Sequence, residues 1–229
     1  MLDPENLLRP NEREMSGKQK RRTIGESRVV IAVPLAGHFI YWKVVAALLE
    51  LERPPESDLM VSQGALIDRA RNHLVQQMLD HPIGATHLFF LDADILPSSD
   101  TLMVLLRHQR PIVSALYRKR LYPHEPMAFM KKGDKIVPIS GKKRGLASAN
   151  LVGAGCLLIE RQVFEKIKPP WFESTWKGKK NLSEDFSFCE KAKKAGFTID
   201  VDMSVTPLHL EPVGIGTNAQ GDPQLVSVF

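Results

Sequence analysis

An apolar run at residues 28–35, RVVIAVPL, limits the folds that are open to this chain. It is rich in β-branched residues and is closed by Pro34, which is typical of a strand buried on both faces of a parallel sheet. A second such run, HLFFL, stands at residues 87–91 and predicts another buried strand. Helical patterns at residues 40–51 and 64–81 lie between the two runs. Strands that alternate with helices predict an α/β fold with a mostly parallel, doubly wound sheet.

The remaining elements are expected to complete this sheet and to add a small antiparallel region. Residues 127–139, MAFMKKGDKIVPI, are expected to form a hairpin that turns at residues 132–134. Further strands are expected at residues 58–63, 111–117, 156–161 and 197–202, and further helices from Ser98 or Ser99 to Arg107 and at residues 161–167 and 181–196. Because no repeat or linker interrupts residues 28–212, we expect a single domain there. A flexible basic tail is expected over residues 1–27, and a C-terminal tail over residues 213–229.

Composition places the chain among ordinary globular proteins. Of its 229 residues, 43% are hydrophobic and 25% charged, and the length allows one large domain with a substantial core. No stretch approaches the roughly 18 apolar residues that a membrane-spanning helix needs. Because the N-terminus also lacks the apolar core of a secretory signal, a cytoplasmic protein is expected. Cys156 and Cys189 are too few for a disulfide framework or a zinc site, so they are expected to be buried free thiols.

Positive charge is concentrated in two parts of the chain. The formal net charge is +5 and the pI is about 9.2, which favours anionic partners such as phosphates or nucleic acid. One basic cluster lies in residues 18–22, and another at residues 118–120 is flanked by Tyr117 and Tyr122. A nucleic-acid-binding protein is therefore the non-enzymatic alternative. Against it, the chain has no recognition motif and few clustered aromatic residues, so no stable nucleic-acid partner is expected.

Two carboxylates follow the apolar strand HLFFL directly. Because residues i and i+2 of an extended chain project to the same side, Asp92 and Asp94 are expected to lie side by side. They stand at the carboxyl end of a buried strand, where ligands bind in open α/β sheets. Two neighbouring anions repel each other, and a hard divalent cation such as Mg²⁺ or Mn²⁺ would compensate them. The structural alternative is that one aspartate caps the next helix while the other is solvated.

Three further features have residue types that are suited to catalysis or ligand binding, but none of them is a specific motif by itself. Glu184 and Asp185 stand in the first turn of an expected helix, where the helix dipole alone favours acidic residues. Gly153 and Gly155 would let the backbone approach a ligand closely. His209 is a candidate third metal ligand, although a lone histidine is more often structural.

Taken in order, these segments resemble the GT-A glycosyltransferases, and most closely their family 2-like members. The resemblance covers residues 28 to about 210. The segments that carry it are VVIAVPL, DRARNHLV, FFLDADILP, VGAGCLLIERQVFEKI, SEDFSFCEKAKKAGFTIDVD and the dipeptide HL at 209–210. It implies a GT-A fold and an enzyme that moves a sugar from a nucleotide-diphosphate sugar, UDP- or GDP-linked, to an acceptor hydroxyl of a sugar, glycan, lipid or protein.

The resemblance also implies a role for particular residues at the donor site. Pro34 and Leu35 match the first strand and loop that cradle the nucleotide. Arg71 and Asn72 match a pair that sits near the nucleotide and the D-x-D motif. The motif itself is Asp92 and Asp94, whose carboxylates hold Mn²⁺ or Mg²⁺ against the donor diphosphate, with Asp94 the more direct ligand.

Further residues match the family's catalytic and acceptor region. His209 matches a histidine that completes the metal shell, and Asp185 matches the general base of inverting members. Glu184 is its partner in the E-D pair. The sugar and acceptor pocket is lined in the family by a segment that corresponds here to Gly153, Ala154 and Gly155.

The chain departs from the family pattern in places, and a second enzyme class remains open. No Q-x-x-R-W motif follows the E-D helix, which argues against the processive synthases, and the loop PLAGHF lacks the usual polar residues. Asp58 is a candidate contact to ribose or base, and retaining members dispense with a general base. A HAD-type phosphatase also uses D-x-D after an apolar strand, but that family has Thr or Val where this chain has Leu96.

Overall fold

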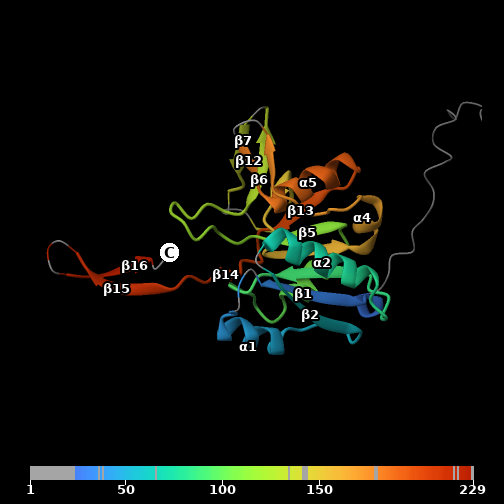
Figure 1. Ribbon diagram of the computed structural model, residues 1–229, viewed down its shortest axis with the longest axis horizontal. Coiled ribbons are helices and arrows are strands. Elements are labelled where there is room, and N and C mark those ends of the chain that lie inside the picture. The colour runs from blue at the N-terminus through green and yellow to red at the C-terminus, as the bar shows by residue number, and fades with distance from the viewer. Residues whose placement is uncertain are drawn as a thin grey trace, which may run out of the picture.

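The computed structural model describes residues 24–35, 37, 39–64, 66–133, 135–140, 144–177, 180–218, 220 and 222–227. Its centre is a seven-stranded sheet with the strand order β2-β1-β3-β10-β5-β13-β8 (Figure 1). In that order the strands are β2 (Ser57–Gln63), β1 (Val29–Leu35), β3 (His87–Leu91), β10 (Cys156–Glu160), β5 (Ile112–Ala115), β13 (Ile199–Asp202) and β8 (Leu146–Ala149).

Most strands of this sheet run in one direction. β2, β1 and β3 are parallel neighbours, and β13 is parallel to β5. β10 is inserted antiparallel between β3 and β5, and β8 is antiparallel to β13. The carboxyl ends of β1, β3 and β5 therefore meet at one edge of the sheet, and the predicted α/β class with a mainly parallel sheet is confirmed.

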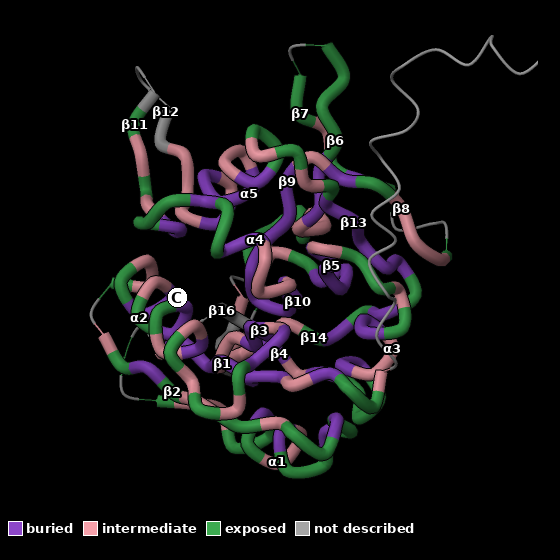
Figure 2. Tube along the Cα trace, turned by 90° about the vertical axis from the view of Figure 1, so that its right-hand side faces the viewer, coloured by how far each residue is buried: buried purple, intermediate pink, exposed green. Residues whose placement is uncertain are grey.

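Helices cover both faces of the sheet, as the alternation of elements predicts. α2 (Ile67–Leu79), α4 (Arg161–Lys166) and α5 (Glu184–Lys194) pack on one face, and α1 (Trp42–Glu50) and α3 (Thr101–Arg107) on the other (Figure 1). Along β1, Val30 and Ala32 enter the core under α2, whereas Val29, Ile31 and Val33 enter the core over α1. The strands at the centre of the tube in Figure 2 are buried accordingly.

Small antiparallel pairs complete the fold. The predicted hairpin is present as β6 (Ala128–Lys132) and β7 (Lys135–Pro138), with β9 (Leu151–Val152) beside β6, and Gly133 has a φ of 58° at its turn. β4 (Ile95–Leu96) pairs with β14 (Leu208–His209), and this pairing joins the segment after β3 to the far end of the chain. β11 (Thr175–Lys177) and β12 (Lys180–Leu182) form a hairpin before α5.

The segment after residue 212 differs from the tail that the sequence predicts. It forms a hairpin of β15 (Val213–Thr217) and β16 (Pro223–Ser227), which extends away from the sheet in Figure 1. The turn is held by Asn218, whose side-chain oxygen accepts hydrogen bonds from the backbone N–H of Gln220 and Asp222 at 3.0 and 2.8 Å. Asn218 therefore lies in a turn, whereas Gly214, Gly216 and Pro223 lie in the two strands.

At the other end of the chain, the description begins with the short 3₁₀ helix η2 (Ile24–Glu26). The basic residues expected in the N-terminal tail lie outside the described residues. Cys156 and Cys189 are buried free thiols, as expected. Within the described part of the chain, no helix has both the length and the apolar character that a membrane crossing requires.

Candidate active site

Asp92 and Asp94 lie where β3 ends, and their side chains line one cavity. The Asp92 N–H donates to the carbonyl of Gly155 at 2.9 Å, which holds the start of the loop against the segment before β10. The chain then turns, and the N–H of Ile95 donates to the Asp92 carbonyl at 3.0 Å. The cavity has a volume of about 220 Å³ and is also lined by Pro34, from the end of β1. Of the predicted donor-site residues, Pro34, Asp92 and Asp94 are thus brought together.

Arg71 of α2 binds Asp92 from the inside of the protein. Its side chain is buried, and one guanidinium nitrogen, Nη2, lies 3.0 and 3.1 Å from the two carboxylate oxygens of Asp92. Its Nε lies 3.3 Å from Oε1 of Glu184, and its guanidinium carbon stands 5.3 Å from the ring centre of Phe90. Burial raises the pKa of Asp92, and the charge of Arg71 opposes this shift. Both oxygens of Asp92 are therefore already engaged.

Asp94 has different partners, His209 from the far end of the chain and Arg120 from the loop after β5. The β4–β14 pairing brings Nε2 of His209 to 3.3 Å from Oδ2 of Asp94. Arg120 reaches the same oxygen, with its Nη1 at 3.4 Å. Partial burial opposes the ionised form of Asp94, but hydrogen bonding and charge from His209, together with Arg120, lower its pKa. The two aspartates therefore bind different side chains: Asp92 binds Arg71, whereas Asp94 binds His209 and Arg120.

The ring of His209 is oriented by the backbone. Its Nδ1 lies 2.7 Å from the carbonyl oxygen of Arg118, which can only accept a hydrogen bond, so Nδ1 carries a proton. The other ring nitrogen then faces Oδ2 of Asp94. Burial disfavours the charged ring, but the hydrogen bonds to Asp94 and to the Arg118 carbonyl raise the pKa of His209. A neutral ring would point a lone pair at a carboxylate, so a positive charge is required between the two atoms.

These donor atoms fit a divalent cation that is shared with a substrate. Among the described residues no group of three or more His, Cys, Asp or Glu side chains converges as a metal site. Mg²⁺ and related ions are commonly bound by one or two protein ligands together with substrate phosphates and water. Asp94 and His209 would supply two such ligands, and a histidine whose other nitrogen donates to a carbonyl is typical of a metal ligand. Asp92, which the sequence groups with them, is instead held by Arg71.

Tyr117 is a residue at this site that the sequence analysis places at the end of an expected strand and beside a basic cluster, with no role in the site. It follows β5, is buried, and accepts a hydrogen bond at its hydroxyl oxygen from the N–H of Gly155 at 3.0 Å. Its ring packs edge-on against His209, with centroids 5.7 Å apart. Burial raises the pKa of Tyr117 well above its usual value, and the negative charge of Asp92 adds to the shift. Its apolar neighbours in the sequence, Ala115 and Leu116, were the available signal that the chain stays in the core beyond the end of β5.

The glycines of the segment 153–155 make room for this tyrosine. A Cβ on Gly153 would stand 2.1 Å from the Tyr117 hydroxyl oxygen, and one on Gly155 would stand 2.9 Å from it. A Cβ on Gly155 would also lie 3.0 Å from Oδ2 of Asp92. The carbonyl of Ala154 faces Arg71 at 3.5 Å. The group that approaches these glycines is a side chain of the protein, and the expected approach to a ligand stays a prediction.

Glu184 and Asp185 open α5, as predicted, but they have separate partners. Glu184 binds Arg71, whereas Asp185 accepts hydrogen bonds from the Ser183 hydroxyl and, at 2.8 Å, from the N–H of Phe186. Asp185 is only 9% exposed. Burial, and then the charge of Glu184, raises the pKa of Asp185 to about 6. A carboxyl group with this pKa exchanges protons close to neutral pH.

The side chain of Asn72 makes hydrogen bonds that hold two parts of the fold together. Its amide nitrogen donates to the carbonyls of Asp68 and Phe172 at 2.8 and 2.6 Å. Its oxygen accepts from the N–H groups of Trp171 and Phe172 at 2.8 and 3.1 Å. The residue that the resemblance assigns to donor binding thus ties α2 to the buried segment after α4.

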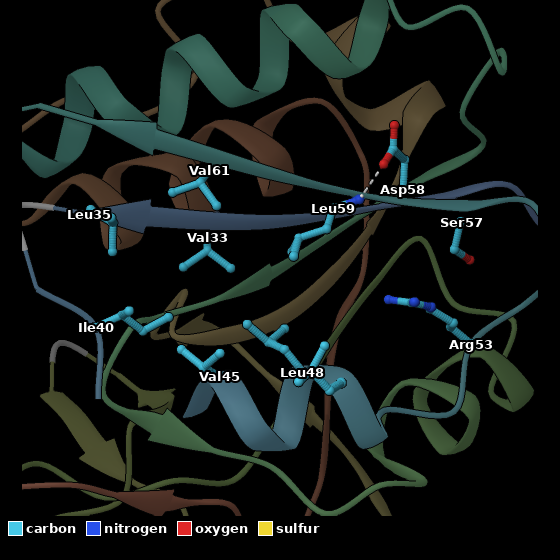
Figure 3. Close-up of a pocket in the computed structure, with 11 residues that line it drawn as sticks. Val33, Leu35, Ile40, Val45, Leu48, Arg53, Ser57, Asp58, Leu59 and Val61 are labelled. Atoms are coloured by element: carbon cyan, nitrogen blue, oxygen red, sulfur yellow. Dashed lines mark hydrogen bonds between the residues drawn. The ribbon is translucent and has the colours of Figure 1, made fainter. Parts of the chain in front are cut away.

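Two other candidates lie away from the cavity that Asp92 and Asp94 line. Leu35 points to the α1 side of the sheet, where it lines a separate, mainly apolar cavity of about 370 Å³ with Val33 (Figure 3). Asp58 stands at the start of β2, beside the same cavity, and pairs with His81 at 3.1 Å. Because β2 is parallel to β1, Asp58 lies at the opposite edge of the sheet from Asp92, so its expected contact to ribose or base is wrong.

Comparison with known proteins defines the class of fold. No protein-family model matches the chain, and no curated protein matches it in sequence. Among solved structures, A197 from STIV is similar with a TM-score of 0.61 and 17% identity, over 86% of this chain and 93% of that one. GalNAc-T7, whose crystal structure holds UDP, GalNAc and Mn²⁺, is similar with a TM-score of 0.55 and 13% identity over 80% of this chain. The match spans only 44% of the GalNAc-T7 chain. The GT-A fold that the sequence resembles is thereby confirmed.

Proposed function

We propose that this protein is a divalent-metal-dependent glycosyltransferase that uses a nucleotide-diphosphate sugar. The observation that carries the proposal is the pair of Asp94 and His209 at the carboxyl end of β3, beside a cavity that Pro34 of β1 also lines. The GT-A fold favours nucleotide-sugar chemistry at this edge of the sheet. GalNAc-T7, which shares the fold, was crystallised with UDP and Mn²⁺.

In this proposal, Asp94 and His209 hold Mn²⁺ or Mg²⁺. The bound ion would neutralise the charge that develops on the leaving diphosphate. The end of β1 at Pro34 cradles the nucleotide. Arg71 acts indirectly, because its guanidinium holds the carboxylates of Asp92 and Glu184 in place.

Asp185 is the proposed general base of an inverting transfer. Its pKa of about 6 leaves it ionised at neutral pH and able to accept the proton of an acceptor hydroxyl. Glu184 is a weaker candidate because Arg71 holds its carboxylate. The phosphatase alternative needs Asp92 as a nucleophile, and the engagement of both its oxygens by Arg71 disfavours that role.

Calorimetric titration of UDP and GDP in Mn²⁺ and in a chelator tests this function. Binding of one nucleotide should require the ion and should be lost in Asp94→Ala. Asp58→Ala is the matched control, because this aspartate lies at the opposite edge of the sheet. If the nucleotide binds equally well in Mn²⁺ and in the chelator, no metal ion links the protein to the nucleotide. A thermal-shift panel of UDP-, GDP- and dTDP-sugars with Mn²⁺ would then identify the donor, since a ligand of the native state raises the melting temperature.

A further inference from the structure

Three consecutive basic residues stand beside the candidate site, and the structure separates their roles. Arg118 donates to the carbonyl of His124 at 3.0 Å, within its own loop. Lys119 pairs with Glu125 at 2.8 Å and lies over the ring of Phe129. Arg120, by contrast, turns toward Asp94. Sequence alone treats the three as equivalent positive charges.

The loop that carries Arg120 is closed by its own hydrogen bonds. The N–H of Met127 donates to the carbonyl of Tyr117 at 2.8 Å, and that of Lys119 donates to the carbonyl of Glu125 at 2.9 Å. The carbonyl of Arg118 is the acceptor that orients His209. The same short segment therefore positions a proposed metal ligand and places a cation next to it.

Arg120 and a metal ion would require the same carboxylate atom. The Nη1 of Arg120 and the Nε2 of His209 both approach Oδ2 of Asp94, at 3.4 and 3.3 Å. A divalent ion bound by Asp94 and His209 would lie against the same oxygen as the guanidinium of Arg120. The two cations would then repel each other. The side chain of Arg120 is 41% exposed, so it is free to swing away at little cost in packing.

We propose that Arg120 is an internal counter-cation that exchanges partners when the site fills. It neutralises Asp94 in the metal-free protein, yields this carboxylate to the divalent ion, and then binds the diphosphate of the donor. Guanidinium groups suit phosphate oxygens because several N–H donors lie in one plane. The inference rests on the proposed function, and it identifies which basic residue of the loop serves the donor.

If Arg120 exchanges partners in this way, its substitution should change the affinity for Mn²⁺ and the affinity for the nucleotide in opposite directions. In Arg120→Gln, Mn²⁺ alone should bind about fivefold more tightly, because the competing charge is gone from a partly exposed site. The Mn²⁺–nucleotide complex should bind about tenfold more weakly, because a charge-assisted contact to the diphosphate is lost. Titration of free Mn²⁺ by electron paramagnetic resonance, and calorimetry of UDP and GDP in saturating Mn²⁺, measure the two.

Lys119→Gln is the matched control, since it removes one positive charge from the same loop without touching Asp94. It should change neither affinity, and thermal melting should show that both variants remain folded. Unchanged or weaker Mn²⁺ binding in Arg120→Gln overturns the proposal, and so does unchanged nucleotide binding. Failure of the proposed function is distinguishable, because the wild-type protein would then bind neither nucleotide in Mn²⁺ whatever the Arg120 variant does.

Discussion

Arg71 and Glu184 stand 113 positions apart in the sequence, yet Nε of the arginine lies 3.3 Å from Oε1 of the glutamate. The same guanidinium binds Asp92, so one buried cation joins α2, the end of β3 and the start of α5. The charge of Arg71 therefore fixes the positions of these three elements relative to one another. The two acidic motifs of the sequence are thus parts of one ionic network.

Loss of Arg71 should therefore damage the whole site. Arg71→Ala leaves Asp92 and Glu184 without their cation and is expected to lower the free energy of unfolding by about 3 kcal/mol. Urea denaturation measures this change. Arg69→Ala, on the exposed side of the same helix, should cost little. Equal stability of the two variants would mean that the network does not hold these elements together.

Asn72 should matter for stability and not for nucleotide affinity. Asn72→Ala removes the partners of the Trp171 and Phe172 N–H groups, and a cost of about 2–3 kcal/mol is expected for leaving such groups unsatisfied. Asn72→Asp keeps the accepting oxygen but turns a second acceptor toward the carbonyls of Asp68 and Phe172, so it should also destabilise the fold. Melting temperature and calorimetry of nucleotide binding separate the two roles. A large loss of affinity at unchanged stability would restore the donor-binding role that the resemblance assigns.

The sheet was predictable because its signal is local and redundant. A strand buried on both faces is apolar along its buried length, as are β1 and, after His87, β3. The position of β10 was not predictable from local pattern, because an antiparallel strand between β3 and β5 has the same apolar sequence as a parallel one. The hairpin after residue 212 was missed because β15 contains Gly214 and Gly216 and β16 begins with Pro223, and both residue types are depleted in strands.

The site was predictable only as a set of residue types. The alternation rule placed Asp92 and Asp94 at one sheet edge, but it says nothing of which cation each carboxylate faces. That choice depends on Arg71 and His209, which come from α2 and β14. The same limit applies to Tyr117, whose hydroxyl fills the space above two glycines that the sequence offers to a ligand. Partners distant along the chain decide the chemistry, and local pattern does not contain them.

The contact between Gly153 and Tyr117 makes a sharp prediction about packing. A Cβ at position 153 would meet the Tyr117 hydroxyl at 2.1 Å and Cε of Met127 at 2.9 Å, so Gly153→Ala should cost about 2–3 kcal/mol through overpacking. Denaturant unfolding measures the cost, and Gly25→Ala is the control because nothing lies within 4 Å of its added Cβ. In a Tyr117→Phe background, which removes the nearest atom, the same substitution should cost less. An identical cost in both backgrounds would place the clash elsewhere.

Asp185 should make the stability of the protein depend on pH, and the burial of its carboxyl group sets the direction of this dependence. Because burial raises the pKa of Asp185 from 3.8 to about 6, the folded protein holds this proton more tightly than the unfolded chain does. The stability that this proton contributes is complete below pH 3.8 and is lost as the pH rises through about 6. In its proposed role as general base, the same carboxyl group would become active as the pH rises through about 6.

Transfer activity should therefore increase with pH with a midpoint of about 6, while stability declines over the same range. Asp185→Asn keeps an oxygen to accept from the Phe186 N–H but cannot take a proton. It should bind nucleotide normally, lose turnover, and show a flatter dependence of melting temperature on pH between 4 and 7. Retained turnover in Asp185→Asn would remove Asp185 from the base role. An unchanged pH profile of stability would show that its carboxyl is not the group that titrates.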